Sequence, residues 1–392
     1  MSTTKTRRLK YGMVGGGPGS FIGAVHRMAI ALDDTAELVA GAFSSKPELS
    51  KQQGETLGLD PKRVYGSYQE MAERESRLGE GEKIDFVVIV TPNAVHYPVA
   101  KVFLEAGFHV VCDKPMTTTL EEAEDLYRLV KKYDAIFCLT HNYTGYPMVK
   151  QARAMIQGGE LGQIRKVVVE YPQGWLATPI DAQGQKQAAW RTDPAIAGAS
   201  SCMGDLGSHA ENLARYLTGL EIESLCADMT TFVPGRRLED DGNVLIHYKG
   251  GSRGVLYASQ ISVGEENNLR IRVYGETGSI EWHQENPNYL YVRYIDKPSE
   301  IYSRGSGYLK ELVQANQRLP YGHPEGFIEA FANIYKRAAN AIRAKKDGTA
   351  PSPIDLDFPT VVDGVLGVHF ILKCVESGKS GAWVDASYNL PA

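Results

Sequence analysis

Three side chains, Lys114, Asp205 and His209, have the chemistry needed to move a proton to or from a substrate. Lys114 follows a short valine-rich segment and precedes a proline, and Asp205 and His209 are four residues apart. A spacing of four places two side chains on the same face of a helix. Histidine, with an ordinary pKa near 6.5, suits general base catalysis, and a carboxylate one turn away can orient it and stabilise its cation. The simpler alternative is an exposed Asp/His pair with no catalytic role.

The stretch 204–217 has the pattern of one helix with a polar row beside its buried face. Polar residues recur at helical intervals, and the neighbouring positions are apolar. We therefore expect the polar row to border a cleft. The polar row consists of Asp205, His209, Asn212 and Tyr216, and the apolar stripe of Leu206, Ala210, Leu213 and Leu217.

A glycine-rich turn at 15–23 follows the first expected strand and opens a helix. Such a turn lets backbone N–H groups approach a pyrophosphate at the positive end of the helix dipole. Gly15 and Gly17 fit the first two glycines of a dinucleotide fingerprint, whereas the third falls at Gly23 only with three extra residues. A tight turn without a ligand is the alternative, but the position after the first strand favours dinucleotide binding. The expected contacts are Gly15, Gly17, Gly19, Phe21 and Ile22.

The end of the second expected strand bears on the choice between NAD and NADP. An acid there would hydrogen-bond the ribose 2′-hydroxyl of NAD. The chain has Ser44, Ser45 and Lys46 instead, whose hydroxyls and ammonium would accept a 2′-phosphate. The cofactor is expected to be NAD or NADP, with a preference for NADP, unless Lys46 is an ordinary solvated loop residue.

Further cofactor contacts are expected where later strands end, because ligands of parallel sheets lie beyond the carboxyl ends of the strands. Lys114 comes at such an end and would project into the same crevice. The other residues expected there are Thr91, Pro92, Asn93, His96, Asp113 and Asn142.

Two patterns of elements divide the chain. Up to about residue 140, short apolar strands alternate with helical stretches, which predicts a parallel, doubly wound sheet. Beyond it, strands follow one another with glycine turns at 249–251 and 275–278, which predicts an α+β domain on one large antiparallel sheet. The expected domains are 1–142 and 143–392. The expected strands are 9–14, 36–43, 84–90, 109–112, 135–140, 164–171, 223–232, 243–248, 253–260, 268–274, 278–282 and 288–294, with late helices at 325–344 and 361–377.

The composition excludes several classes of protein. The chain has 392 residues, 43% hydrophobic and 23% charged, with a net charge of −5, so no basic field favours nucleic acid or an anionic membrane. No apolar run approaches the roughly 20 residues that span a bilayer. Five cysteines without CxxC spacing indicate a reducing compartment and no structural zinc site, and no metal is expected. Arg7 and Arg8 resemble an export signal only faintly, because no apolar stretch follows, so a cytoplasmic location is expected.

Taken together, the sequence motifs make the chain resemble the Gfo/Idh/MocA family of sugar and cyclitol oxidoreductases over essentially its whole length. Five motifs occur in the family's order, which is more specific than any one of them. They are the glycine turn with His26, Thr91-Pro92-Asn93 with His96, Asp113-Lys114-Pro115, Trp190-Arg191, and Asp205-Leu206-Gly207-Ser208-His209, followed by Asp363-Gly364 before the last helix.

The resemblance implies a Rossmann domain followed by a domain with an open-faced antiparallel sheet, and hydride transfer between a nicotinamide and a carbon bearing a secondary hydroxyl. It implies that Lys114 contacts cofactor and substrate, that His209 takes the hydroxyl proton, and that Asp205 holds His209. Trp190 and Arg191 would shape the sugar pocket, with Tyr143 and His323 as weaker candidates. Asp113 replaces the usual Glu, and Asn212 stands where many members have a second Asp.

Two other functions remain open at this point. Some relatives of the family hydrolyse glycosides by transient oxidation and keep their NAD, and a regulator could use the same fold without catalysis. A sugar, glycoside or cyclitol is the expected small-molecule substrate. An open sheet face is expected to be an apolar patch that needs a partner, so a homodimer or homotetramer is expected.

Overall fold

The structure is a computed structural model that describes residues 8–391, so Arg7 of the arginine pair lies outside the described residues. The first domain is built on a parallel five-stranded sheet in the order β2-β1-β3-β4-β5. The sequence order reverses between β1 and β3, as in a Rossmann domain, and the predicted parallel, doubly wound sheet is confirmed. The strands are β1 (Leu9–Gly15), β2 (Ala36–Ala42), β3 (Phe86–Val90), β4 (His109–Cys112) and β5 (Phe137–Leu139).

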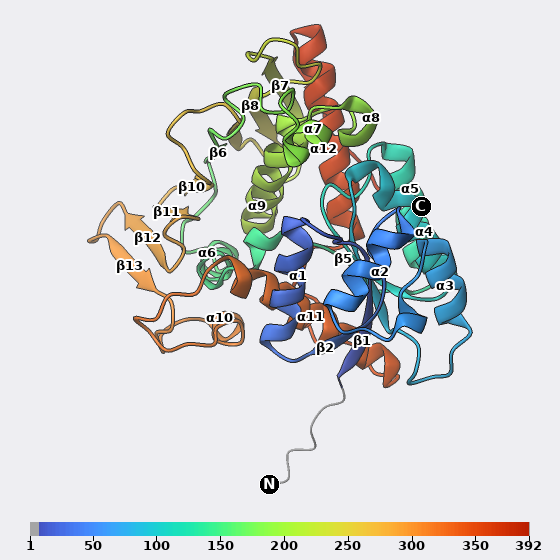
Figure 1. Cartoon of the computed structure of the whole chain (residues 1–392). Helices are drawn as coiled ribbons and strands as arrows, with labels where there is room; N and C mark the ends of the chain where they lie inside the picture. The colour runs from blue at the N-terminus through green and yellow to red at the C-terminus, as the bar shows by residue number, and fades with distance from the viewer. Residues whose placement is uncertain (1–7, 392) are drawn as a thin grey trace.

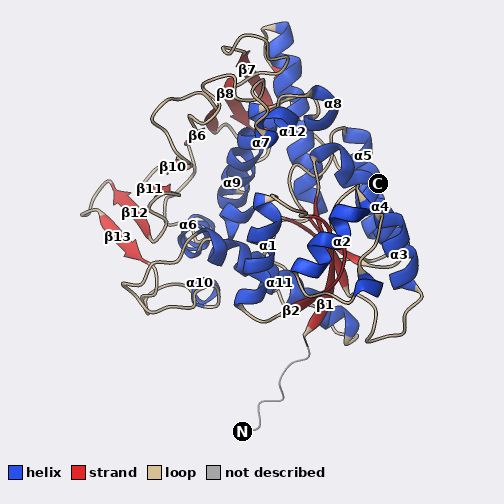
Figure 2. Cartoon of the chain, viewed as in Figure 1, coloured by secondary structure: helices blue, strands red, loops and turns tan. Residues whose placement is uncertain are grey.

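Helices cover both faces of this sheet, as Figure 2 shows. The apolar run of β3 is buried along its whole length, which is typical of a central parallel strand. The helix α5 shows the local signals that form such elements: Thr119 caps its first turn, acidic residues follow, and two lysines end it. The helices are α1 (Phe21–Leu32), α2 (Pro47–Thr56), α3 (Tyr68–Ser76), α4 (His96–Glu105) and α5 (Leu120–Lys132).

The second sheet has nine strands in the order β13-β12-β11-β10-β6-β9-β8-β7-β14. Every neighbouring pair is antiparallel except β6 and β9, which run parallel. The chain between these two strands is long and contains a helix, so it can return to the same end of the sheet. The strands are β6 (Lys166–Pro172), β7 (Ile222–Thr230), β8 (Asp241–Tyr248), β9 (Arg253–Ser259), β10 (Arg270–Tyr274), β11 (Gly278–His283), β12 (Tyr289–Tyr294), β13 (Glu300–Ser303) and β14 (Val384–Asp385).

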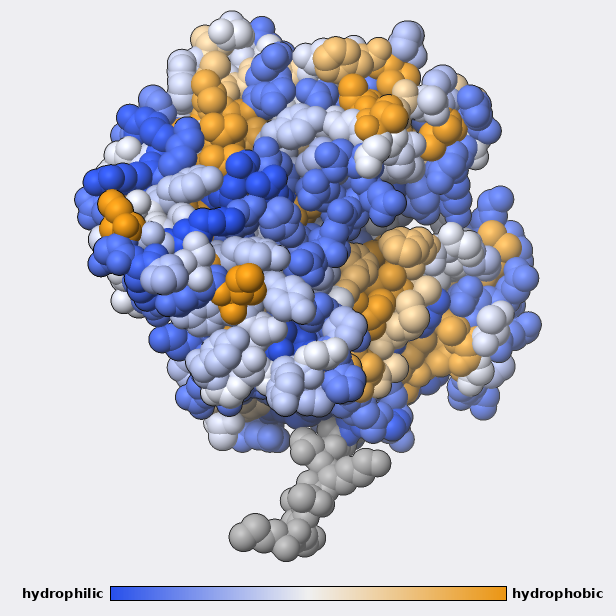
Figure 3. Space-filling view, turned by 90° about the vertical axis from the view of Figure 1, so that its left-hand side faces the viewer, coloured by the Kyte–Doolittle hydropathy of each residue, from blue (hydrophilic) through white to orange (hydrophobic). Residues whose placement is uncertain are grey.

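The two faces of the second sheet differ. One face packs its apolar side chains against α6 (Pro147–Gln157), α9 (Ser208–Thr218) and α12 (Val361–Ser380). The other face bears charged pairs, such as Glu281 with Arg270 and Arg293, each at 2.8 Å. Figure 3 looks onto the side where β10 to β13 lie and shows it mainly hydrophilic, with hydrophobic groups in separate patches. The outer face is therefore mixed in character, and the expectation that it is one large apolar patch is wrong.

Two late helices return to the Rossmann sheet. The helix α11 (Phe327–Lys346) packs on α1, and α12 packs on α5 before it reaches β7 (Figure 1). Between them the chain runs beside β5, where the backbone N–H of Leu139 donates to the carbonyl of Pro359 at 2.8 Å. The remaining helices, α7 (Lys186–Arg191), α8 (Pro194–Ala197) and α10 (Glu311–Gln314), are short. The C-terminal segment therefore fastens the two sheets together. No helix among residues 8–391 is long and apolar enough to cross a membrane.

The close approach of α11 to the segment after β5 predicts one stability effect. A Cβ added at Gly145 would collide with the backbone carbonyl of Ala330 in α11, which cannot move aside as a flexible side chain could. We expect Gly145→Ala to lower the free energy of unfolding by about 1–3 kcal/mol. Chemical denaturation followed by circular dichroism measures this change. The control is Gly307→Ala, an exposed position with open space around it, where unchanged stability is expected. Equal stability of the two variants would contradict the packing described.

Candidate active site

The glycine turn lies at the point where the strand order reverses, at the carboxyl end of β1. Gly15 has φ +85°, and a Cβ on it would lie 2.6 Å from the carbonyl oxygen of Val90 at the end of β3. A Cβ on Gly17 would lie 2.6 Å from the carbonyl oxygen of Phe43, and one on Gly23 would lie 2.5 Å from Cα of Gly16. These three positions need glycine. Gly23 thus has the helix-packing role of the third glycine in a dinucleotide turn, despite the three extra residues.

The start of α1 presents features that suit a dinucleotide. Ser20 caps the helix by accepting from the N–H of Gly23 at 3.2 Å, and Phe21 at the first position is two-thirds exposed. First-turn N–H groups of a helix have no partner within the helix and favour an anion. Two buried polar atoms near the strand ends, Oγ1 of Thr91 and Nδ2 of Asn142, have no hydrogen-bond partner among the described residues. The residues present fit a nicotinamide dinucleotide.

The remaining predicted cofactor residues lie at the same edge of the sheet. Ser44 accepts the N–H of Lys46 at 3.1 Å, while the side chains of Ser45 and Lys46 are exposed. His96 has its two ring nitrogens 2.8 Å from the carbonyl oxygens of Pro115 and Thr91. Asn93 donates to the carbonyl of Ala197 at 3.0 Å.

The side chains of His96 and Asn93 therefore hold neighbouring loops in place. Asp113 accepts from Oγ1 of Thr140 at 2.8 Å and from the backbone N–H of Lys114 at 3.1 Å. It orients the segment that carries the lysine.

Lys114, from the first domain, and Asp205, from the second, form an ion pair. The Nζ of Lys114 donates to Oδ1 of Asp205 at 2.7 Å and to its backbone carbonyl at 2.6 Å. The Oδ2 atom accepts from Nε of Arg191 at 3.0 Å and from Nε2 of Gln260 at 3.2 Å. Burial works against ionisation of Asp205, but the charges of Lys114 and Arg191 outweigh it and hold the pKa well below its usual range. Two cations therefore share one carboxylate.

His209 lies beside this pair, but Asp205 does not hold it. Within residues 8–391 the hydrogen bonds of the Asp205 carboxylate go to Lys114, Arg191 and Gln260. The reason is local: Met203–Gly207 forms a π-helical turn before α9 begins at Ser208. A wider turn changes the angular relation between residues before and after it, so a spacing of four no longer places both side chains together. The expected single α-helix over 204–217 is wrong on this point.

His209 contacts a second histidine instead. Its Nδ1 lies 3.4 Å from Nδ1 of His141, and the ring of Tyr143 lies edge-on at 4.7 Å. Burial lowers the pKa of His209 well below its ordinary value, and the charges of Lys114 and His141 lower it further. Burial also lowers the pKa of His141 to about 3, against an opposite effect of Asp363. Both imidazoles are neutral near pH 7, and a neutral imidazole can accept a proton.

Two indole rings lie beside the guanidinium of Arg191. The guanidinium lies 4.2 Å from the ring centre of Trp190 and 5.8 Å from that of Trp175. Arg191 is thus fixed by Asp205 on one side and by two indole rings. This places Trp190 and Arg191 next to the Lys114–Asp205 pair, as a pocket wall would require.

The two weaker candidates lie differently. Tyr143 is buried, and its hydroxyl is bonded to that of Tyr171 and to Nδ2 of Asn267, the latter at 3.3 Å. Burial raises the pKa of Tyr143 to about 12, so it stays protonated. His323 is exposed on the segment before α11, and the hydrogen-bond partner of its ring among the described residues is the carbonyl of Tyr321, 3.3 Å from Nδ1. The structure brings Tyr143 to the other site residues and does not bring His323 to them.

Three residues of the site are absent from the sequence-based prediction: His141, Trp175 and Gln260. His141 precedes Asn142 at the end of β5, so its position at the carboxyl edge of the sheet was a signal available in the sequence. Nothing local marks Trp175 or Gln260, because long-range packing brings them to Arg191 and Asp205. Among residues 8–391, no group of three His, Cys, Asp or Glu side chains could hold a metal ion.

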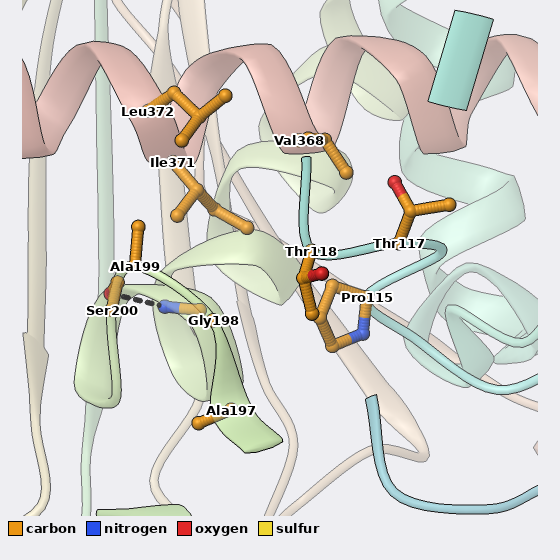
Figure 4. A pocket seen from close by; sticks show the side chains of 11 residues that line it. Pro115, Thr117, Thr118, Ala197, Gly198, Ala199, Ser200, Val368, Ile371 and Leu372 are labelled. Atoms are coloured by element: carbon orange, nitrogen blue, oxygen red, sulfur yellow. Dashed lines mark hydrogen bonds between the residues drawn. The ribbon is translucent and has the colours of Figure 1, made fainter. Parts of the chain in front are cut away.

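A small cavity lies behind the lysine loop, between the segment after β4, the segment after α8, and α12 (Figure 4). Its volume is about 10 Å³, which is roughly the space of one water molecule. The lining is largely apolar and includes Pro115, Thr118, Ala199 and Ile371. It is a packing gap at the junction of the domains and has no room for a sugar.

Comparison with known proteins agrees with this arrangement. A family model described as "Oxidoreductase family, NAD-binding Rossmann fold" matches residues 9–141, and one described as "GFO/IDH/MocA C-terminal domain" matches 149–281. The chain belongs to the Gfo/Idh/MocA oxidoreductase family. It is therefore an NAD-binding oxidoreductase, and the matched ranges fall on either side of the expected domain boundary.

Individual relatives extend over nearly the whole chain. The uncharacterized oxidoreductase YfiI of Bacillus subtilis is 38% identical over 97% of both chains. A crystal structure of an inositol dehydrogenase homolog with NAD⁺ from Azotobacter vinelandii has a TM-score of 0.93 at 38% identity, covering 97% of this chain and 98% of that one. A levoglucosan dehydrogenase from Pseudarthrobacter phenanthrenivorans is 26% identical over 97% of this chain and 98% of its own length.

The ion pair between the domains predicts a pH-dependent stability difference. Removing the charge in Asp205→Asn leaves Lys114 and Arg191 without their counter-charge, and we expect a loss of about 1–3 kcal/mol in the free energy of unfolding near neutral pH. Because the folded-state pKa of Asp205 is depressed, its contribution is present above the unfolded value of about 3.9 and is lost as the pH falls through the folded value. Denaturant unfolding from pH 7 downward should show a constant difference that shrinks below about pH 4.

The matched control for this measurement is Asp125→Asn, at the more exposed pair with Lys101. This change should cost less than about 1 kcal/mol. Two results would contradict the electrostatic role: equal free energies of unfolding for wild type and Asp205→Asn at pH 7, or a difference between them that grows on acidification.

Proposed function

We propose that this protein is an NAD(P)-dependent dehydrogenase that oxidises a secondary hydroxyl of a pyranose, glycoside or cyclitol, or reduces the corresponding ketone. The observation that carries the proposal is the bond between Lys114, at the end of β4, and Asp205, at 2.7 Å, because Asp205 lies in the turn that leads into α9, the helix that bears His209. The charge of Lys114 also lowers the pKa of His209. An ammonium and a neutral imidazole can serve one hydroxyl together.

Each residue has a distinct task in this reaction. A bound nicotinamide supplies the acceptor for the hydride. Lys114 donates a hydrogen bond to the substrate oxygen and stabilises the negative charge that develops on it. His209 takes the hydroxyl proton on Nε2, which has no protein partner among residues 8–391.

The role of Asp205 differs from the one expected. Its carboxylate fixes Lys114 and Arg191, at 2.7 and 3.0 Å, and so acts through the lysine. Trp190 and Arg191, with Trp175, form a wall that can contact a sugar ring by stacking and by hydrogen bonds. Tyr143 borders the same space beside His209.

The named relatives support this class of substrate. Structures related to this chain include an inositol dehydrogenase homolog with NADH and myo-inositol and a levoglucosan dehydrogenase with NADH and levoglucosan. Both compounds carry several secondary hydroxyls on a ring. The same relatives support NAD as cofactor, while Ser44, Ser45 and Lys46 support acceptance of NADP as well. The proposed cofactor is therefore NAD or NADP, and the preference for NADP rests on these three residues.

Two further features complete the proposal. Among residues 8–391, α6, α9 and α12 pack on one face of the nine-stranded sheet. A homodimer or homotetramer through the other face remains our proposal, and the mixed apolar and charged character of that face suits a specific interface. All five cysteines are free, and four of them are buried, which supports a reducing compartment such as the cytoplasm.

The proposal predicts turnover that depends on Lys114. Purified protein should produce or consume the nicotinamide absorbance with NAD or NADP and some member of a panel of pyranoses, glycosides and cyclitols. Lys114→Met should lower kcat/KM by about 100-fold or more, because the developing negative charge loses its ammonium partner. Lys101→Met, on the surface helix α4, is the matched control and should keep wild-type activity. Bound cofactor without turnover of any panel member, in either direction, would refute the proposal.

The pH dependence of oxidation is a second prediction. A general base must be neutral in the free enzyme, and the pKa of His209 lies below its ordinary value of 6.5. The rate constant kcat/KM should therefore stay level down to pH values below 6.5 and decline only at lower pH. His209→Gln should reduce kcat/KM by about 100-fold or more and remove this decline. A decline centred above pH 6.5 in wild type would identify a different base.

A further inference from the structure

Two buried imidazoles, those of His141 and His209, contact each other in the candidate active site. The two Nδ1 atoms lie 3.4 Å apart, and the rings meet edge-on with their centres 5.2 Å apart. His141 is 2% exposed and His209 is 8% exposed. Two ring nitrogens that face each other at this distance form a hydrogen bond when one carries a hydrogen and the other a lone pair, and a neutral imidazole carries a hydrogen on only one nitrogen.

The position of that hydrogen decides whether His209 can be a base at Nε2. If Nδ1 of His209 carries it, Nε2 keeps its lone pair and can accept a proton. If His141 carries it, the hydrogen of His209 is on Nε2, which can then only donate. The hydrogen-bond partner of one ring nitrogen decides which of the two nitrogens carries the hydrogen.

Among residues 8–391, the polar groups of Asp205 and Tyr143 hydrogen-bond to residues other than His209. The carboxylate of Asp205 is bonded to Lys114, Arg191 and Gln260. The hydroxyl of Tyr143 is bonded to Tyr171 and Asn267. Among residues 8–391, His141 is thus the only hydrogen-bond partner of His209's ring.

Charges from neighbouring elements act on both rings, and together with burial they leave both imidazoles neutral near pH 7, as an accepting Nδ1 on His141 requires. Lys114, in the loop after β4, disfavours a proton on His209, whereas Asp363, at the start of α12, favours positive charge on His141. Lys114 and Arg215 of α9 oppose Asp363 at His141. Asp363 is itself fixed by Arg215 at 2.8 Å and by the N–H of Thr360 at 2.6 Å. Asp363 is thus a fixed carboxylate whose charge acts on His141.

We propose that His141 is a positioning residue for His209: its Nδ1 accepts the Nδ1–H of His209 and so keeps the lone pair of His209 on Nε2. The proposal rests on the proposed dehydrogenase function. When the substrate O–H bond breaks, its proton forms a bond with Nε2 of His209. The carbon that bears this oxygen gives up its hydride to the nicotinamide. His209 is then a cation whose Nδ1–H bond to His141 becomes charge-assisted and stronger.

The test compares His141→Asn with His141→Leu. The two side chains have the same branching, but only asparagine offers a hydrogen-bond acceptor. We expect kcat/KM of His141→Asn to stay within about tenfold of wild type. His141→Leu should fall by about 100-fold or more. Histidine ¹⁵N resonances at pH 7 report which ring nitrogen of His209 carries the hydrogen, without any need for turnover.

The resonances should show Nδ1–H in wild type and His141→Asn, and a shift towards Nε2–H in His141→Leu. Hydrogen on Nε2 of His209 in wild type, or equal kcat/KM and equal tautomers in the two variants, would overturn the proposal. If His141→Leu fails to fold, the wild-type resonances alone decide it. If wild type turns over no polyol but the tautomer shifts as expected, the positioning role stands and the proposed function fails.

Discussion

The ion pair between Lys114 and Asp205 is the interaction on which the rest of the site depends. It joins the loop after β4 of the Rossmann domain to the π-helical turn before α9 of the second domain, so it exists only when both domains are folded and docked. Arg191 shares the same carboxylate, which leaves more positive than negative charge at this point. A site with that balance favours an oxygen that gains negative charge during hydride transfer.

A second carboxylate, Asp363, lies on the histidine side of the site. The family resemblance led us to expect an acid at the position of Asn212, and the Nδ2 of Asn212 lies 3.4 Å from Oδ1 of Asp363. Asp363 comes from the start of α12, so a distant segment supplies a negative charge close to the place where the helix α9 lacks one. Asp205 thus pairs with the lysine, whereas the charge of Asp363 raises the pKa of His141.

The scaffold keeps these groups in place through its late helices. α11 packs on α1 beneath the nucleotide turn, and α12 contacts both the Rossmann helix α5 and the strand β7. Each helix therefore touches elements of both halves of the chain and joins the two sheets beyond the short connection after β5. In the proposed reaction Lys114 and His209 act on one substrate oxygen from different domains, and a small displacement of either would cost much of the rate.

Much of this protein was determined by local patterns in its sequence. Alternating apolar runs and glycine turns predicted nearly every strand, because each signal lies within a few residues. The glycine turn and the three residues Lys114, Asp205 and His209 were likewise recognised from short motifs. The tertiary structure alone decided which partners these residues have. The π-helical turn moved Asp205 away from His209, and chain segments far apart in sequence brought Gln260, Trp175 and His141 to the site. Hydrogen-bond partners depend on side-chain direction after packing, which no spacing within one segment encodes.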